Sequence, residues 1–185
     1  MTAVLRDRAG PPAPVTVRAP TPGDASALWR LVGETGGLDR NSPYAYLLVC
    51  SHFAATSAVA DAGDGAAGPA RLGGFLSGYR PPGRPEALFV WQVAVAPGLR
   101  GRGLGRRMLE EVLARPALAG LTHVEATVGP ANAASQALFR SFARRRSAPV
   151  AVTDAFGADL FPEPGHEPEL LFRIGPLGPP PPQDP

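Results

Sequence analysis

Apolar residues recur along this chain with two different periods, and each period predicts its own kind of element. Alternation or short apolar runs predict strands over residues 15–18, 57–61, 72–80, 122–128 and 169–174. The stretch 87–95 is almost continuously apolar, which is typical of a central strand buried on both faces. Helical spacing covers residues 21–32, 42–53, 104–113 and 133–142. This order predicts an α/β fold in which helices flank one mixed sheet.

Local sequence signals predict where the first two helices begin. Thr21 is an N-cap candidate because a proline follows at the first helical position and an acid lies in the first turn. Ser42, again followed by proline, caps the second helix in the same way. Residues 36–41 therefore form an interhelical loop. The Gly- and Ala-rich stretch 63–71 predicts a long hairpin turn between two strands.

Composition bounds the class of protein. A chain of 185 residues with 44% hydrophobic content is long and apolar enough for one domain with a sizeable core. We expect this domain to span residues 15–177, after a disordered tail over 1–14 and before a Pro-rich tail over 178–185. The net charge of +2, with arginine as the only strongly basic residue type, is too mild to predict nucleic-acid binding.

The sequence lacks two features of exported or membrane proteins, and this indicates the cellular compartment. Cys50 is the only cysteine and lies in an apolar run, so no internal disulfide is possible and a buried, inert thiol is expected. The chain has no basic, apolar leader, and no apolar run approaches the roughly 20 residues that span a bilayer. We expect a soluble cytoplasmic protein with no membrane partner.

The strongest chemical signal is a glycine-rich turn between the central strand and the next helix. Gly101, Gly103 and Gly105 alternate with other residues, which lets backbone N–H groups approach an anion at the helix N-terminus. Arg100, Arg102 and Arg106 add charge-assisted donors for a pyrophosphate. The alternative is a tight turn whose arginines only face solvent. A Walker A loop and a dinucleotide fingerprint both require other spacings.

The segment Arg100-Gly101-Arg102-Gly103-Leu104-Gly105 resembles the pyrophosphate-holding turn of the GNAT acetyltransferase superfamily, which follows the fourth strand of that fold. Asn132 to Phe139 resembles the superfamily helix that lines the CoA arm. The resemblance implies that acetyl-CoA is bound by Val93, Ala94, Val95, Arg100, Gly101, Arg102, Gly103, Leu104, Gly105, Arg106, Asn132 and Phe139. Phe139 departs from the pattern, because many relatives carry a tyrosine there that protonates the leaving thiolate. Another group or water must then supply that proton.

Longer segments, including residues 38–48, 77–82, 88–95, 139–144 and 166–169, are similar to the L-2,4-diaminobutyrate acetyltransferases of ectoine biosynthesis. This likeness covers about residues 15–177. It implies a GNAT fold with a single, mixed, mostly antiparallel central sheet. It also implies acetyl transfer to the γ-amine of a diamino acid and a homodimer. The product would be γ-N-acetyl-L-2,4-diaminobutyrate, a precursor of the compatible solute ectoine. No metal ion is expected.

A diaminobutyrate site must hold one carboxylate and one ammonium while the second amine attacks. Asp39 can pair with an ammonium, Trp91 can offer it a π-face, and Tyr44 can hydrogen-bond either end. The resemblance adds His166 and Glu169 to the acceptor site. Each of the first three has a plain alternative: a loop turn for the aspartate, core packing for the tryptophan and a helix surface for the tyrosine.

Acetyl transfer to an ammonium near neutral pH requires a base, because an aliphatic ammonium has a pKa of about 10.4. Glu125, on the strand expected to diverge beside the central one, is the candidate through one or two waters, with a solvent-facing strand position as the alternative. Trp91 and Tyr44 are also expected beside the reacting amine. Backbone N–H groups near Val93 would stabilise the thioester oxyanion. The isolated Cys50 favours direct transfer over an acyl-enzyme.

Two other functions remain open from the sequence. One is a GNAT enzyme acting on a different amine, on a protein or on another small molecule. The other is a non-catalytic acyl-CoA-binding or nucleic-acid-binding module, suggested by the run Arg144-Arg145-Arg146. Such a run is more often a solvated helix end beside the negative pole of the helix dipole.

Overall fold

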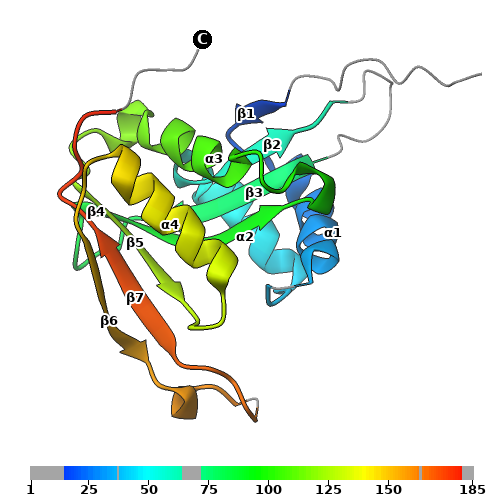
Figure 1. The fold of residues 1–185 in the computed structure, drawn as a ribbon. Helices are drawn as coiled ribbons and strands as arrows, with labels where there is room; N and C mark the ends of the chain where they lie inside the picture. Colours follow the sequence, from blue (N-terminus) through cyan, green and yellow to red (C-terminus); the bar gives the residue numbers. More distant parts are fainter. Residues whose placement is uncertain (1–14, 37, 64–71, 163, 181–185) are drawn as a thin grey trace, which may run out of the picture.

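The computed structural model describes residues 15–36, 38–63, 72–162 and 164–180. Its strands and helices follow one another along the chain as β1 (Thr16–Arg18), α1 (Ala25–Thr35), α2 (Pro43–His52), β2 (Ala58–Asp61), β3 (Leu72–Tyr79), β4 (Ala87–Val95), α3 (Leu104–Leu113), β5 (His123–Val128), α4 (Ala133–Arg145), β6 (Val150–Phe156) and β7 (Glu169–Ile174) (Figure 1). The strands form one sheet in the order β1-β2-β3-β4-β5-β7-β6. Only β4 and β5 pair in parallel. The predicted α/β class with a mixed, mostly antiparallel sheet is confirmed.

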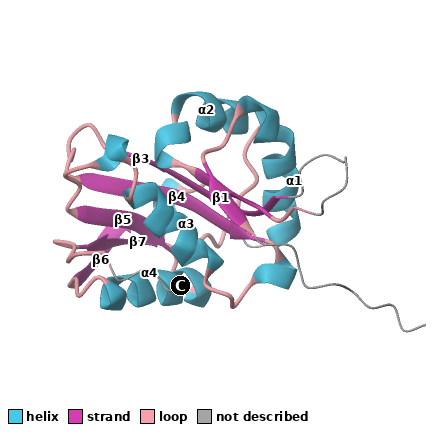
Figure 2. Ribbon diagram, turned by 90° about the horizontal axis from the view of Figure 1, so that it is seen from above, coloured by secondary structure: helices cyan, strands magenta, loops and turns pink. Residues whose placement is uncertain are grey.

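The sheet separates two helical layers and two cores. Figure 2 shows α1 and α2 on one face of the sheet and α3 and α4 on the other. Leu28 and Phe75 belong to the core beneath α1 and α2, whereas Leu76 and Phe142 belong to the core beneath α3 and α4. Neighbours on β3 enter different cores because side chains alternate across a strand. Each such fully buried side chain contributes about 1.5–3 kcal/mol to stability.

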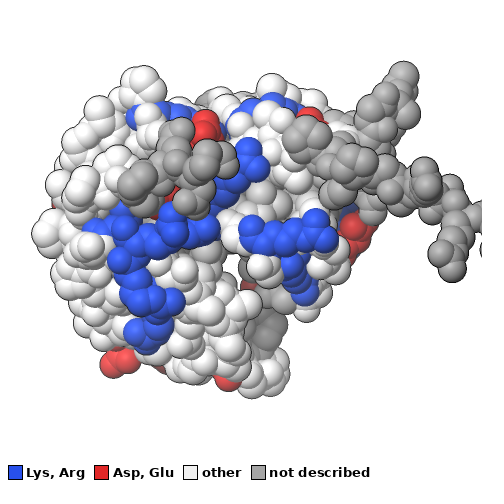
Figure 3. Space-filling model, turned by 45° about the horizontal axis from the view of Figure 1, so that its top comes forward, with Lys and Arg blue, Asp and Glu red and all other residues white. Residues whose placement is uncertain are grey.

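Arginine side chains gather on the face of the sheet that α3 and α4 cover (Figure 3). Figure 3 shows arginine side chains on both sides of a hollow, on the face of the molecule that carries α3 and α4. The chain as a whole has 18 basic and 16 acidic residues. The arginines on this face are therefore gathered by the fold and do not reflect a large net positive charge.

The strand β6 was not predicted from the sequence. It is an edge strand that pairs only with β7, and every residue in it except Val150 is exposed. An edge strand exposed on both faces needs no apolar alternation, so the periodicity that marks the other strands is missing. The prediction of a single strand after α4 was therefore wrong.

The ends of the described chain bear on two further predictions. Gly178 still contacts the body, because its N–H donates to the Arg146 carbonyl oxygen at 2.9 Å. The predicted N-terminal tail over 1–14, most of the hairpin turn predicted over 63–71 and residues 181–185 of the predicted C-terminal tail lie outside the described residues. Within the described ranges, no helix has the length and apolar character that crossing a bilayer requires.

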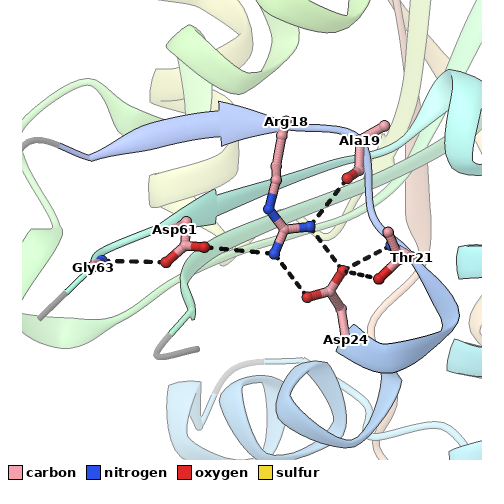
Figure 4. A network of polar contacts seen from close by, with 6 residues as sticks. All are labelled: Arg18, Ala19, Thr21, Asp24, Asp61 and Gly63. Atoms are coloured by element: carbon pink, nitrogen blue, oxygen red, sulfur yellow. Dashed lines mark hydrogen bonds and ion pairs between the residues drawn. The ribbon is translucent and has the colours of Figure 1, made fainter. Parts of the chain in front are cut away.

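A polar network fixes the start of α1 against the sheet (Figure 4). The Asp24 carboxylate accepts hydrogen bonds from the Arg18 guanidinium at 2.8 and 2.9 Å and from the Thr21 N–H and hydroxyl at 2.7 and 2.9 Å. Arg18 also forms an ion pair with Asp61 at 3.6 Å. The predicted cap at Thr21 thus closes a short 3-10 turn ahead of α1. Mainly the hydrogen bonds from Arg18 lower the pKa of Asp24 to about 2.

The Asp24→Asn variant should be less stable than the parent by about 1–2 kcal/mol at neutral pH, after discounting for solvent around the partly exposed Arg18. A lowered folded-state pKa stabilises the fold fully above the unfolded pKa, and this contribution is lost as pH falls through the folded value. Urea unfolding from pH 7 down to pH 2 measures the difference between parent and variant. We expect the full difference in unfolding free energy above about pH 4 and a smaller difference toward pH 2. A constant difference down to pH 2 would contradict the assignment.

Candidate active site

The glycine turn has the geometry of an anion site. Gly101 and Gly103 adopt positive φ values of 76° and 72°, which only glycine adopts readily, and α3 begins directly after them. The Arg107 N–H donates to the Gly103 carbonyl oxygen at 3.0 Å. The N–H groups of Leu104, Gly105 and Arg106 precede this first helical bond, so they have no helical acceptor and are available to an anion.

The third glycine serves close packing. A Cβ atom at Gly105 would lie 3.3 Å from Val93 Cγ1 and 3.4 Å from Leu138 Cδ2. Gly105 therefore lets the first turn of α3 approach both β4 and α4. This approach brings the turn, the end of β4 and the start of α4 around one space.

That space is a cavity of about 790 Å³, within the usual range for a small-molecule site. All the predicted cofactor residues line it except Phe139. The sequence did not predict the other lining residues, which are Thr35, Leu38, Leu99, Ala134, Ser135, Leu138 and Ser141. Helical spacing was an available signal for three of these, because Ala134, Leu138 and Ser141 follow the i, i+4, i+7 pattern of one face of α4.

Phe139 points away from the cavity. It is 3% exposed and belongs to the core beneath α3 and α4, while its neighbour Leu138 lines the cavity. The structure therefore gives no support for direct contact between Phe139 and a ligand there. Asn132 lines the cavity and also caps α4, since its side-chain oxygen accepts from the Ser135 N–H at 3.1 Å.

Arg100 has a structural role at the rim of the cavity. Its Nε donates to the Val95 carbonyl oxygen at 3.1 Å, and its Nη2 donates to the Thr35 carbonyl oxygen at 2.9 Å. The side chain ties the end of α1 to the end of β4, and its other N–H groups remain for an anion. Arg102 and Arg106 line the same cavity, so the arginines of the turn form a basic wall beside the helix N-terminus.

A β-bulge in β4 lies beside this cavity. Ser77 pairs with Gln92 and Gly78 with Val90, which leaves Trp91 as the extra residue. The bulge reverses the alternation of β4. Val90 before it enters the core beneath α3 and α4, whereas Ala94 after it enters the core beneath α1 and α2.

Trp91 itself lies 48% exposed on the bulge. It does not line the large cavity but borders a second one of about 270 Å³, together with Val49, Phe53, Ser77, Gly78 and Tyr79. Core packing, the alternative for this tryptophan, is therefore excluded. Tyr44 is 66% exposed on the first turn of α2.

Strands β4 and β5 diverge next to the bulge. Their pairing ends at Phe89 and Glu125, so the β4 edge beyond this point has no β5 partner. Glu125 is fully buried, which excludes the solvent-facing alternative. Its Oε2 accepts from Arg84 Nε at 2.9 Å, and its Oε1 accepts from Arg173 Nη1. Both oxygens of the candidate base are thus occupied by guanidinium groups from other elements.

Acidic groups from separate segments interact around the start of β7. Burial is the main cause that raises the pKa of Glu169, at the start of β7, and the negative charges of Asp39 and Glu167 raise it further. A hydrogen bond with Thr127 and the charge of His166 act in the opposite direction. Asp39 in the α1–α2 loop and His166 and Glu167 in the β6–β7 loop are therefore near enough to Glu169 to influence its ionisation.

His166 is held within the β6–β7 loop. Its ring stacks on Phe161 with centroids 3.7 Å apart, and its Nδ1 lies 2.6 Å from the Glu167 carbonyl oxygen. The Glu167 carboxylate accepts from the Ala131 N–H at 3.0 Å, which fastens this loop to the chain just before α4. Asp39 and His166 thus act electrostatically on Glu169. Trp91 borders the second cavity, and Tyr44 is exposed on α2.

The arginine run at the end of α4 is not a uniform basic surface. Arg146 is 7% exposed and forms an ion pair with Glu110 at 2.5 Å. A solvated helix end was therefore the wrong interpretation for Arg146. The nucleic-acid alternative loses one of the three arginines on which it rested.

Comparisons with known proteins agree with the sequence motifs. The model of the acetyltransferase (GNAT) family matches residues 41–143. The chain is 43% identical over 165 residues to the L-2,4-diaminobutyric acid acetyltransferase of Halalkalibacterium halodurans, covering 89% of this chain and 84% of that protein. It is 47% identical over 167 residues to the protein of the same name from Streptomyces avermitilis, covering 90% of each.

A solved structure is similar over the same range. It is the diaminobutyrate acetyltransferase of Paenibacillus lautus in complex with its substrate L-2,4-diaminobutyric acid and coenzyme A. It superposes with a TM-score of 0.82 at 41% identity, covering 88% of this chain and 95% of that chain. The resemblance indicated by the sequence motifs is confirmed.

Proposed function

Because the chain belongs to the L-2,4-diaminobutyric acid acetyltransferases, within the GNAT acetyltransferases, we propose that it moves an acetyl group from acetyl-CoA to the γ-amine of L-2,4-diaminobutyrate. The product is γ-N-acetyl-L-2,4-diaminobutyrate, which a later enzyme closes to ectoine, a compatible solute. The similar protein from Paenibacillus lautus is described with both diaminobutyric acid and coenzyme A, which supports this pair of ligands.

The observation that carries the proposal is the opposite charge of the two halves of the site. The glycine turn offers arginines and helix N–H groups, which suit the pyrophosphate of acetyl-CoA. The α1–α2 loop, the β6–β7 loop and the start of β7 offer Asp39, Glu167 and Glu169, which suit a substrate with two amines. The divergence of β4 and β5 after Phe89 and Glu125 leaves room for the thioester between the halves.

Transfer proceeds directly in a ternary complex. The neutral γ-amine attacks the thioester carbon, an N–C bond forms, the C–S bond breaks, CoA leaves as a thiolate and the amide nitrogen releases its extra proton to water. Cys50 supports this over an acyl-enzyme, because burial raises the pKa of its thiol to about 11 and it lies in the core beneath α1 and α2. Backbone N–H groups of β4 near Val93 stabilise the oxyanion. Since Phe139 has no proton to donate, water or another group protonates the thiolate.

Glu125 is the base in this scheme and takes the ammonium proton through one or two waters. Its place at the last β4–β5 pair supports this role. Val124 and Ala126 enter the core beneath α3 and α4, so Glu125 and Thr127 face the other side, toward the acidic loops. Each Glu125 oxygen accepts one guanidinium N–H, from Arg84 or Arg173, and keeps a second lone pair that can receive the proton.

The Glu125→Gln variant should lower the turnover number by about a hundredfold or more, the usual contribution of a general base. Circular dichroism checks that it is folded. Glu86→Gln is the matched control, because Glu86 pairs with the same Arg173 at 2.9 Å but lies at the surface. The control should keep the parent turnover. A folded Glu125→Gln enzyme within about tenfold of the parent would remove Glu125 from the role of base.

We also propose that the enzyme acts in the cytoplasm, where acetyl-CoA is available, and as a homodimer. Two-fold symmetric pairs are the commonest oligomers, and several large apolar side chains are exposed, including Leu47, Phe53 and Tyr79. Light scattering at micromolar concentration should give twice the monomer mass. A monomer mass would end the homodimer proposal.

A panel of amines tests the choice of acceptor. We expect kcat/KM for L-2,4-diaminobutyrate to exceed that for L-ornithine by about tenfold or more, because one extra methylene changes the fit of the chain to the pocket. L-Lysine and a peptide amine should react more slowly still. Faster acetylation of the peptide amine would favour the alternative of a protein acetyltransferase.

A further inference from the structure

A buried amide connects the central strand to the acceptor loop. Gln92, the residue after the bulge, is 6% exposed, and its Nε2 donates to the Asp39 carbonyl oxygen at 2.9 Å. Its backbone N–H donates to Ser77 Oγ at 3.2 Å, which closes the bulge. Burying a polar side chain in a central strand is costly unless it is hydrogen-bonded. The contact with Asp39 provides that bond and joins segments 53 residues apart.

A second contact holds the same loop on its other side. The guanidinium of Arg40 lies over the Trp29 ring of α1, 3.9 Å from its centroid. A Cβ atom at Gly33 would lie 2.9 Å from Arg40 Nη1. The lack of a side chain at Gly33 therefore leaves room for the Arg40 guanidinium against α1. The loop is therefore tied to β4 at Asp39 and to α1 at Arg40. The carboxylate of Asp39 stays exposed between these two anchors.

We propose that Gln92 is a positioning residue that holds Asp39 where it meets the acceptor amine. This inference rests on the proposed function. It assigns no contact between Gln92 and substrate, because the amide acts on the backbone of Asp39 and leaves its carboxylate free for an ammonium. A displacement of about 1 Å can remove much of the contribution of a binding group. Loss of the Gln92 hydrogen bond should therefore weaken substrate binding by Asp39 as well as loosen the loop.

The test is Gln92→Met, which keeps the length of the side chain and removes the donor. The KM for L-2,4-diaminobutyrate should rise about five- to tenfold, while the KM for acetyl-CoA stays within about twofold. Hydrogen exchange of the peptide covering residues 38–42 should become faster. The matched control is Arg80→Met, because Arg80 Nε donates to the Pro85 carbonyl oxygen at 2.9 Å, also a side-chain bond to a loop carbonyl, in the β3–β4 connection, to which no substrate-binding residue is assigned. The control should leave the diaminobutyrate KM unchanged.

Three results would overturn the proposal. They are a diaminobutyrate KM equal to that of the parent, an equal rise in both KM values, and unchanged exchange of the loop. If Gln92→Met does not fold, Trp29→Leu removes the second anchor without altering β4, and it should raise the diaminobutyrate KM about threefold. Parent-like KM and loop exchange in that variant would also overturn it. A parent enzyme that does not acetylate diaminobutyrate would contradict the proposed function instead, and hydrogen exchange would still report on the anchor.

Discussion

Gly103→Glu should lower the affinity for acetyl-CoA by more than about a hundredfold, as measured by isothermal titration calorimetry. Gly103 has a φ of 72° at the N-cap of α3, and a Cβ atom there would lie 3.2 Å from Arg106 Nη2. A glutamate therefore strains the turn and puts a negative charge at the helix N-terminus. Its carboxylate would also attract the arginines that we assign to the pyrophosphate.

Gly98→Glu is the matched control for this variant. Gly98 lies in the 3-10 turn Pro97–Leu99, is not among the residues that line the cavity, and has no atom within 4 Å of the position of an added Cβ. It makes the same change of charge five residues from Gly103 without entering the turn. We expect it to bind acetyl-CoA within about threefold of the parent. Unchanged affinity in a folded Gly103→Glu protein would show that the glycine turn is not the cofactor site.

Asp39→Asn should raise the KM for L-2,4-diaminobutyrate about ten- to a hundredfold. The variant keeps the shape of the side chain and the carbonyl that Gln92 binds, but it loses an ion pair to an ammonium. Such a charge-assisted bond contributes about 1.5–3 kcal/mol. Steady-state kinetics with each substrate varied in turn measures the effect.

The affinity for acetyl-CoA decides whether Asp39 belongs to the acceptor half. It should stay within about threefold of the parent, since the carboxylate is assigned to the amine and not to the cofactor. Glu111→Gln, an equivalent change at an exposed acid of α3 that does not line the cavity, should alter neither substrate. If Asp39→Asn lost affinity for acetyl-CoA but kept normal diaminobutyrate kinetics, Asp39 would belong to the cofactor half and not to the acceptor half.

The residues of the proposed cofactor half are nearly continuous in sequence, which is why most residues lining the cavity could be predicted. The end of β4, the glycine turn and the start of α3 follow one another from Val93 to Arg106. Residues that are neighbours in the sequence therefore form most of this part of the cavity. Phe139 was the exception. A helical motif marks its presence on α4 but not which face of that helix points to the core.

The acceptor half depends on contacts between distant segments, which periodicity does not reveal. Glu125 is an acid in an apolar strand, and its partners Arg84 and Arg173 lie 41 and 48 residues away. The bulge at Trp91 is set by pairing with β3, and the anchor from Gln92 to the loop is visible only once the sheet is built. The family resemblance provided His166 and Glu169, and the structure then showed that Glu169 interacts electrostatically with both Asp39 and His166.

The identity and position of the acetylated nitrogen test the central claim most directly. The purified protein is incubated with acetyl-CoA and L-2,4-diaminobutyrate, and the product is analysed by mass spectrometry with fragmentation. The account predicts a product heavier by one acetyl group, carried on the γ-nitrogen, and release of one free CoA thiol for each product formed. Acetylation at the α-nitrogen, or no acetylated diaminobutyrate from an enzyme that binds acetyl-CoA, would contradict it.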